Sequence, residues 1–380
     1  PGQGIRASAK GSMETLILTA ADLRGVVTEV GLDRLMDELI ERLENALLER
    51  TATLEVPARD GFSYHSPEPG LLEWMPCHDV LGRVTCKFVG YHPRNPEARG
   101  LPTILSTIGC WDATSGHLRV IADGTLLTAL RTGAASAIAT RLLAREGAVT
   151  LGLVGCGAQA VSQLHGLSRV VELRRVLIHD IDPRAASSFA HRVAPLGLHL
   201  RPEVVPLDEL VREADVISTQ TTVEVDHGPV FPDRNLRPWV HVNAVGSDFP
   251  GKTEVPVTLL DRALICPDFR AQAIREGECQ QVAAERIGPS LADLVCAREK
   301  MAHARAEPTV FDSTGWALED DVALELVLSH AKALGIGARV EIEWASEDPR
   351  DPYAGLPPRG TAVEAKQRAL DIAPRAASGM

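Results

Sequence analysis

Hydrophobic periodicity changes several times along this 380-residue chain. From Leu16 to Glu49, leucine and isoleucine recur every three or four residues with acids and arginines between them, which predicts an amphipathic helix of about twenty residues. Residues 51–121 instead contain short β-rich runs separated by Gly, Pro and Asn-Pro, which predicts a small, mostly antiparallel sheet. From Gly124 to Ala144 the residues are small and favour a helix whose alanines permit close packing.

The second half of the chain alternates strands with helices. An apolar run from Val149 to Val154 predicts a buried parallel strand, and a helix is expected from Ala158 to Val171. A second strand is expected from Arg175 to His179, and the alternation continues further along the chain. This rhythm predicts an α/β fold with a Rossmann-type, doubly wound parallel sheet. Further helices are expected from Arg286 to His303 and from about Ala317, the second of which returns to the first part of the chain.

The segment between these two strands has the pattern of a dinucleotide site. Gly155 permits a tight turn after the first strand, and Gly157 lets a pyrophosphate approach the backbone. Ala160 is small enough for the following helix to pack on the strand, and the N-terminus of that helix attracts phosphate. Asp180 ends the second strand, where a carboxylate accepts hydrogen bonds from a ribose and repels a 2′-phosphate, with Asp182 as the alternative acid. The pattern predicts NAD as the cofactor, in preference to NADP.

Composition narrows the class of protein. The formal charge of −12 and the lack of basic stripes argue against a nucleic-acid partner. No run of about eighteen apolar residues exists, and no basic region precedes an apolar core at the N-terminus, so neither a membrane span nor a secretion signal is expected. The seven cysteines form no CxxC pair, which predicts neither a metal site nor a disulfide framework and favours a reducing cytoplasm. Residues 1–12 are expected to be a loose leader or an artificial extension, and residues 354–380 a mobile tail.

Four charged islands lie in apolar or glycine-rich surroundings, and they are centred on Glu73, Lys87, Arg131 and Asp248. Taken singly, each has a structural explanation. A lysine or arginine beside a strand often extends its charge to solvent, and an aspartate after a glycine region often stabilises a turn. A glutamate before a tryptophan is often a surface carboxylate.

The motifs taken together carry a family resemblance. In order along the chain they are EWMP, K-x-VG-x-HP-x-NP, GLPTI, LLTALRTGAASA, GCGAQA, NAVGSD-x-PGKTE and FDSTG-x-A-x-ED. From about Met13 to Tyr353 the chain thereby resembles the ornithine cyclodeaminase/mu-crystallin family. Within this family, the residues of its motifs look most like those of the lysine cyclodeaminases that make L-pipecolate for natural products. The resemblance implies a homodimer with an NAD-binding Rossmann domain at 130–316. A substrate-binding and dimerisation domain would combine 13–129 with 317–353.

The resemblance also implies an ammonia-lyase reaction on a diamino acid. In such enzymes tightly held NAD takes a hydride from the α-carbon, the distal amine attacks the resulting imine, ammonia leaves and the hydride returns. Arg131 and Lys87 match a clamp for the substrate carboxylate, with Arg59 as a third member. Asp248 matches the acid–base group beside the reacting amine, and Glu73 matches the carboxylate near the distal amine.

Other residues match the family's cofactor and substrate contacts. Those carried over for NAD are Thr103, Ala158, Gln159, Asp180, Thr221, Val245, Gly246, Lys252 and Ser313. Thr314 is expected to touch the substrate. L-Ornithine, giving L-proline, stays open as the substrate because it differs from L-lysine by one methylene. An NAD(P)H-dependent ketimine reductase or amino-acid dehydrogenase is a second alternative, and a crystallin-type binding protein, disfavoured by the intact charged residues, is a third.

Overall fold

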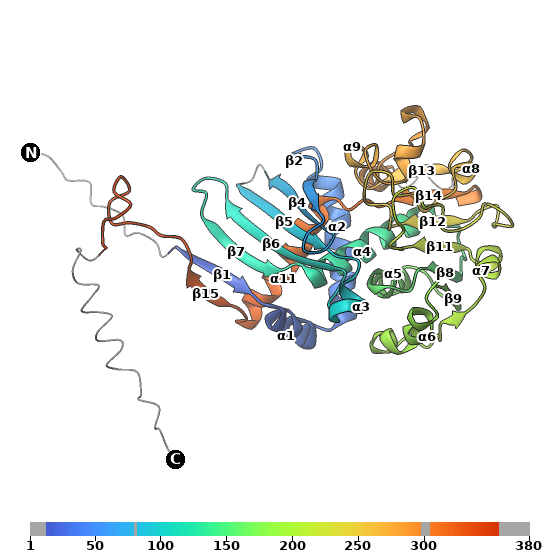
Figure 1. The fold of residues 1–380 in the computed structure, drawn as a ribbon, viewed down its shortest axis with the longest axis horizontal. Helices are drawn as coiled ribbons and strands as arrows, with labels where there is room; N and C mark the ends of the chain where they lie inside the picture. Colours follow the sequence, from blue (N-terminus) through green and yellow to red (C-terminus); the bar gives the residue numbers. More distant parts are fainter. Residues whose placement is uncertain (1–12, 80–81, 298–304, 357–380) are drawn as a thin grey trace, which may run out of the picture. The chain divides into compact units, whose positions relative to one another are not determined.

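The computed structural model describes residues 13–79, 82–297 and 305–356 of the chain. Residues Thr15–Val340 form one compact unit. The compact unit contains two β-sheets with helices packed around them (Figure 1). Most of the predicted tails, 1–12 and 354–380, lies outside the described residues. The amphipathic helix of about twenty residues predicted near the N-terminus is present as an 18-residue helix at Leu32–Glu49, but the residues before it form a strand and a separate helix.

That N-terminal segment contains a strand and two helices. Strand β1 (Glu14–Leu18) pairs in parallel with β7 (Leu118–Asp123), so tertiary pairing overrides the helical spacing of its apolar residues. Helix α1 (Ala20–Val30) begins at a capping box in which the Thr19 and Asp22 side chains cap the first turn. Gly31 has a φ of +91° and separates α1 from α2 (Leu32–Glu49), because that conformation ends a helix and favours glycine.

The first sheet has eight strands and is mostly antiparallel, as predicted. Its order is β15-β1-β7-β6-β5-β4-β2, with β3 also paired to β4. The remaining strands are β2 (Leu54–Glu55), β3 (Asp60–Tyr64), β4 (Gly70–Asp79), β5 (Arg83–Tyr91), β6 (Ile104–Asp112) and β15 (Ala338–Glu341), and the short helix α3 (Asn95–Arg99) joins β5 to β6. Alternation along β4 and β5 turns Glu73 and Lys87 to the buried face of this sheet.

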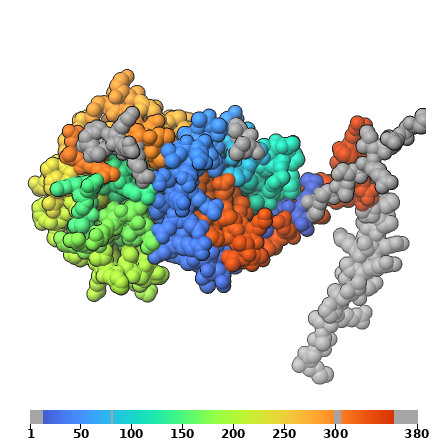
Figure 2. Space-filling view, turned by 180° about the vertical axis from the view of Figure 1, so that it is seen from behind, coloured from blue at the N-terminus to red at the C-terminus, as the bar shows by residue number. Residues whose placement is uncertain are grey.

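Helices α2, α4 (Thr125–Leu143) and α11 (Ala317–Leu334) pack together beside that buried face, and α4 and α11 contact the sheet. Figure 2 shows the blue α2 and the orange-red α11 side by side. Their shared core contains Leu39, Leu43, Ile108, Ala134 and Leu324. The predicted helix from about Ala317 is confirmed, and α4 matches its prediction to within one residue at each end.

The second sheet is entirely parallel, with the order β10-β9-β8-β11-β12-β14-β13. Its strands are β8 (Thr150–Val154), β9 (Arg175–His179), β10 (Glu203–Val204), β11 (Val216–Thr219), β12 (His241–Ala244), β13 (Leu264–Pro267) and β14 (Thr309–Asp312). Its helices are α5 (Ala158–Ser168), α6 (Pro183–Arg192), α7 (Leu207–Glu213), α8 (Val257–Leu260), α9 (Arg270–Ala273) and α10 (Leu291–Cys296). The chain reverses direction of winding between β8 and β11, which is the switch point where such sheets bind ligands. The predicted doubly wound sheet is confirmed.

Two predicted helices in this region differ in length. Helix α5 ends at Ser168, three residues before the predicted end. Of the helix expected from Arg286 to His303, the described residues contain α10, which begins after the Ser290 cap, and residues 298–304 lie outside the description. The proposed division at 129/130 and 316/317 stays a prediction. Its first boundary falls inside α4, a continuous helix.

Candidate active site

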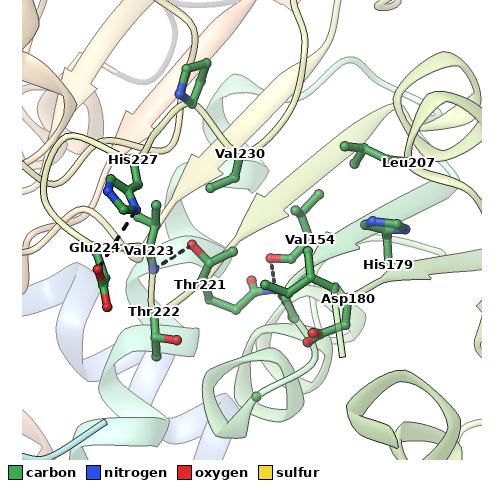
Figure 3. Close-up of a pocket in the computed structure, with 15 residues that line it drawn as sticks. Val154, His179, Asp180, Leu207, Thr221, Thr222, Val223, Glu224, His227 and Val230 are labelled. Atoms are coloured by element: carbon green, nitrogen blue, oxygen red, sulfur yellow. Dashed lines mark hydrogen bonds and ion pairs between the residues drawn. The ribbon is translucent and has the colours of Figure 1, made fainter. Parts of the chain in front are cut away.

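A cavity of about 630 Å³ lies at the carboxyl edge of the parallel sheet, at the switch point (Figure 3). Gly155 and Gly157 line it from the turn after β8, and Asp180 lines it from the end of β9. Residues 220–224, which follow β11, form another wall. The predicted glycine turn, ribose acid and sheet edge therefore meet around one space.

The glycine turn leaves room for a ligand. Gly155 has a φ of +89°, which favours glycine, and a Cβ there would lie 3.1 Å from the carbonyl oxygen of Gln220. A Cβ on Gly157 would meet no atom within 4 Å among the described residues, so its backbone faces open space. No side chain of the described residues caps α5, whose first residues are Ala158 and Gln159. The backbone N–H groups in the first turn of α5 therefore have no side-chain acceptor in the described residues, and such groups at a helix N-terminus fit a pyrophosphate.

The two candidate ribose acids have different partners. The Asp180 carboxylate accepts hydrogen bonds from the backbone N–H groups of Cys156 (2.6 Å) and Asp182 (2.8 Å), which fixes it at the cavity wall. The Asp182 carboxylate caps α6 by accepting a hydrogen bond from the backbone N–H of Arg184 (2.9 Å). This arrangement favours Asp180 as the residue that faces a ribose.

Thr221, which lines the cavity, is held by Glu254, an acid to which the sequence assigned no role. Glu254 is fully buried, and its carboxylate accepts hydrogen bonds from Thr221 and from the backbone N–H of Gly246 (2.7 Å). It thereby joins Thr221 to the segment that contains Val245 and Gly246, and all three residues were predicted as cofactor contacts. The buried Ser313 hydroxyl, at the end of β14, has no hydrogen-bond partner in the described residues, so it is available to a bound group.

A second cavity, of about 470 Å³, shares residues 222–224 with the first. Its charged lining includes Glu73, Asp248 and Lys252. Lys252 donates a hydrogen bond to Asp248 (2.8 Å) and lies over the ring of Tyr91, 5.4 Å from its centre. Lys252, predicted as a cofactor contact, thus lines the second cavity. Thr103 lines neither cavity, although the adjacent Ile104 lines the second.

Glu73 and Asp248, two acids of the second cavity, have pKa values that are shifted in opposite directions. Burial works to raise the pKa of Asp248, but the Lys252 ammonium and the Arg59 guanidinium outweigh burial and hold that pKa below its ordinary value. Burial raises the pKa of Glu73, against the opposing effect of Arg59. The site therefore contains one carboxylate that favours the ionised form and one that accepts a proton more readily.

Arg59 lies between several acidic groups. Its side chain donates a hydrogen bond to the carbonyl oxygen of Asp248 (3.2 Å) and contacts the carbonyl oxygen of Thr314. Its guanidinium lies 3.7 Å from the Glu73 carboxylate and 3.5 Å from that of Glu276. Glu276 was not predicted from the sequence, and burial raises its pKa to about 7. Arg59 was predicted as the third member of the clamp formed by Lys87 and Arg131, and its ion-pair contacts are with Glu73 and Glu276 instead; its role in holding the carboxylate stays a prediction.

Lys87 and Arg131 are buried, and they line neither the first nor the second cavity. The Lys87 ammonium is 2.7 Å from the Asp320 carboxylate, and Arg131 donates a hydrogen bond to Glu319 (2.8 Å). Both acids begin α11 and were not assigned roles from the sequence, although the motif FDSTGWALED contains them. A sequence signal that could have identified them is the pair of adjacent acids in the first turn of a helix that is otherwise mostly apolar.

The Thr314 hydroxyl already has two protein partners. It donates a hydrogen bond to the Asp268 carboxylate (3.0 Å) and accepts one from the Gln272 amide (2.9 Å). The backbone carbonyl oxygen of Thr314, and not its hydroxyl, contacts Arg59, which was predicted to bind the substrate. The predicted contact between the Thr314 side chain and the substrate stays a prediction.

The described residues contain no group of three or more His, Cys, Asp or Glu side chains arranged to hold a metal ion. In the same part of the chain, no helix combines the length and apolarity needed to cross a membrane.

Comparison with known proteins identifies the family. The model of the ornithine cyclodeaminase/mu-crystallin family matches residues 22–334. The L-lysine cyclodeaminase of Streptomyces rapamycinicus is 46% identical over 345 residues, which cover 90% of this chain and 100% of that protein. The ornithine cyclodeaminase of Agrobacterium fabrum is 30% identical, covering 87% of this chain and 95% of that protein.

Solved structures give the same result. A lysine cyclodeaminase, studied for its recognition of L-lysine, L-ornithine and L-2,4-diaminobutyric acid, has a TM-score of 0.87 and 48% identity over 90% of this chain and 99% of that one. An archaeal alanine dehydrogenase dimer with bound NAD has a TM-score of 0.75 and 30% identity over 87% of this chain and 100% of that one. The chain therefore belongs to the ornithine cyclodeaminase/mu-crystallin family.

Proposed function

We propose that this protein is an NAD-dependent ammonia-lyase that converts L-lysine to L-pipecolate and releases ammonia. The observation that carries the proposal is the meeting of two cavities at residues 222–224, one suited to a dinucleotide and the other lined by Glu73 and Asp248. The 46% identical relative is an L-lysine cyclodeaminase. We propose in addition that the present protein acts in the cytoplasm and serves natural-product biosynthesis.

The cofactor site combines the glycine turn, Asp180 and the strand ends tied by Glu254. Gly155, Gly157 and the start of α5 receive the pyrophosphate, and Asp180 receives the adenosine ribose. Ser313 and the segment beside Gly246 lie at the nicotinamide end, together with Thr221. When bound, NAD accepts a hydride from the substrate α-carbon and returns it to the cyclic imine, so no second substrate is required.

Protein groups supply the binding and proton transfers. Arg131 and Lys87 hold the substrate α-carboxylate, and Arg59, whose guanidinium lies beside Glu73 and Asp248 of the second cavity, adds a third cation. Asp248 has a lowered pKa and takes a proton from the α-ammonium group, which prepares that nitrogen for imine formation. Glu73 has a raised pKa and accepts a proton from the distal ammonium, which leaves a neutral amine able to close the ring.

L-Ornithine, giving L-proline, is the nearest alternative substrate. One methylene changes transition-state binding by about 1–3 kcal/mol in an apolar pocket. The apolar part of the second cavity, which includes Leu71, Val89 and Ile104, accommodates the chain between the two amines. A reductase or dehydrogenase activity is the other alternative, because alanine dehydrogenase is among the relatives. The buried Glu73 carboxylate favours a diamine over alanine.

A homodimer through the eight-stranded sheet is part of the proposal. Strand register places Phe62, Phe88 and Leu105 on the face of the sheet opposite Glu73 and Lys87. These three side chains are 54%, 44% and 42% exposed, respectively, so their face presents apolar surface to solvent. An archaeal relative is a dimer. A second copy covering this face, with residues 13–129 and 317–353 as the dimerisation domain, is the arrangement that we propose.

The function is tested with isotopes. NAD is expected to co-purify with the protein, and L-lysine labelled with ¹⁵N at the α-position is expected to release labelled ammonia and leave unlabelled pipecolate. Deuterium at the α-carbon is expected to return to the product because the hydride stays on the enzyme. Label retained in the ring, or deuterium lost to solvent, would contradict the mechanism. If L-ornithine is turned over faster than L-lysine, the proposed substrate is wrong and L-ornithine takes its place. If the protein consumes NAD(P)H with a keto or imino acid, the proposed lyase reaction is wrong and the protein is a reductase or dehydrogenase.

A further inference from the structure

Two adjacent acids at the start of α11 pair with Lys87 and Arg131, the two cations of the proposed carboxylate clamp. Glu319 and Asp320 are each 1% exposed. The Asp320 carboxylate lies 2.7 Å from the Lys87 ammonium through one oxygen and 3.2 Å from Nε of Arg131 through the other. The Glu319 carboxylate pairs with Nη1 of the same arginine. Asp320 therefore bridges a strand of the first sheet and helix α4.

Lys87 needs this anion because its surroundings oppose a positive charge. Its side chain is 1% exposed, so water provides little solvation for the ammonium group. Arg131, on α4, and Arg59, before β3, add like charges, whereas Glu73 on β4 adds an opposite charge at longer range. Among the described residues, Asp320 is the acid within ion-pair distance of the Lys87 ammonium.

We propose that Asp320 is a positioning residue that keeps Lys87 protonated and fixes its ammonium beside the Arg131 guanidinium, so that both cations face the substrate α-carboxylate. This inference rests on the proposed function, because it assigns the acid that supports the carboxylate clamp. Asp320 acts through Lys87 and Arg131 and does not touch the substrate.

The geometry of Arg131 agrees with this role. Asp320 is next to Nε and Glu319 is bonded to Nη1, so no ion pair in the described part of the chain uses Nη2. One nitrogen of the guanidinium is left for the substrate. Burial lowers the pKa of Lys87 to about 8, and Asp320 raises that pKa against the opposing effects of Arg131 and Arg59. Removing the carboxylate therefore moves the pKa of Lys87 further down.

Asp320→Asn is the direct test, and Asp321→Asn is the matched control. Asp321 is the next residue of α11, is also buried, and pairs with Arg83 (2.8 Å) and Thr85 (2.6 Å), away from Lys87. Two measurements are compared in each variant. The first is kcat/KM for L-lysine as a function of pH. The second is the pKa of Lys87 by NMR of protein with isotope-labelled lysine side chains, assigned by the resonance that is missing in Lys87→Met.

In Asp320→Asn the alkaline limb of kcat/KM and the pKa of Lys87 are expected to fall together by about one pH unit or more. KM at pH 8 is expected to rise at least about fivefold and to recover at lower pH, since a pKa that falls by one unit from about 8 lowers the protonated fraction of Lys87 at pH 8 from about one half to about one tenth. In Asp321→Asn both properties are expected to stay at wild-type values, although stability falls. A merely structural role of Asp320 would lower activity without moving the pH profile.

A further variant keeps the inference testable if Asp320→Asn fails to fold. An arginine stays protonated throughout this pH range, so Lys87→Arg is expected to lose the alkaline limb that we expect for wild type near pH 8. An alkaline limb that stays in Lys87→Arg, or a Lys87 pKa that is the same in wild type and Asp320→Asn, would overturn the inference. Lack of turnover of any diamino acid by the wild type would instead overturn the proposed function, and the NMR titration would still decide the role of Asp320.

Discussion

Glu254 and Thr221 are joined by two hydrogen bonds to a single oxygen. Oε1 of Glu254 accepts from both the backbone N–H and the hydroxyl of Thr221, at 2.6 Å each. The other oxygen accepts from the Thr219 hydroxyl and from the backbone N–H of Gly246, at 2.7 Å each. One buried carboxylate thus fixes the ends of β11 and β12, the two strand ends that flank the proposed nicotinamide site.

Replacing that carboxylate should loosen both strand ends. Glu254→Ala leaves four donors without their acceptor, and each unsatisfied buried group costs about 1–3 kcal/mol. We expect a lower free energy of unfolding and NAD binding weakened at least about tenfold, measured by denaturation and by nucleotide titration. Asp261→Asn, at an exposed acid after α8, is the control and should change neither. Unchanged NAD affinity in Glu254→Ala would contradict the assignment of this end of the cavity.

The preference for NAD over NADP should depend on Asp180. We expect Asp180→Ala to narrow the difference between the two affinities, because the carboxylate no longer repels a 2′-phosphate. NAD affinity should also fall, since the Cys156 N–H loses its acceptor and the glycine turn loosens. Asp182→Ala is the control, because losing the α6 cap should lower stability by about 1 kcal/mol without changing the preference. Equal affinities for NAD and NADP in wild-type protein from which bound nucleotide has been removed would contradict the proposal that Asp180 selects NAD.

Arg131 should affect both stability and substrate binding. Arg131→Ala leaves the buried Glu319 and Asp320 without this partner, and breaking a buried pair in this way costs about 3–5 kcal/mol. We expect a lower midpoint in denaturant for this variant. Arg131→Lys retains a charge but loses the two-sided pairing, so it should fold better and raise KM for L-lysine while leaving NAD affinity unchanged. A KM equal to that of wild type in Arg131→Lys would argue against the carboxylate clamp.

The titration of Lys87 should change stability and substrate binding in opposite directions. The pKa of Lys87 is lowered from 10.5 to about 8 by burial, so between these values the unfolded chain holds a proton that the folded protein has lost. The Lys87 contribution to the free energy of unfolding therefore rises as pH increases from about 8 to 10.5, whereas affinity for the substrate carboxylate falls. Denaturation and KM measured across this window should show both trends. Lys87→Met should remove the stability trend, and Lys332→Met, at an exposed lysine, should preserve it.

The sequence by itself determined the parts of the site whose geometry is set within one supersecondary unit. The order strand, glycine turn, helix, strand and acid placed Gly155, Gly157 and Asp180 correctly around one cavity. Short connections leave few ways to arrange these residues, because a strand feeding a helix and a parallel strand fixes where each end lies. The apolar runs of the second sheet were equally informative, since buried parallel strands have no polar face.

Only the tertiary structure decided which charges meet across long separations in the chain. Arg131 and Glu319 are 188 positions apart, and no local pattern states that α11 presents its first acids to α4 and β5. The same holds for Glu254, whose partners lie at or just after the ends of β11 and β12. At Leu16–Leu18 the helical spacing gave the wrong element, because pairing with β7 outweighs a weak local preference. Local backbone preferences fix turns and strand ends, but the partners of a buried charge depend on how whole elements pack, and that is a property of the folded chain alone.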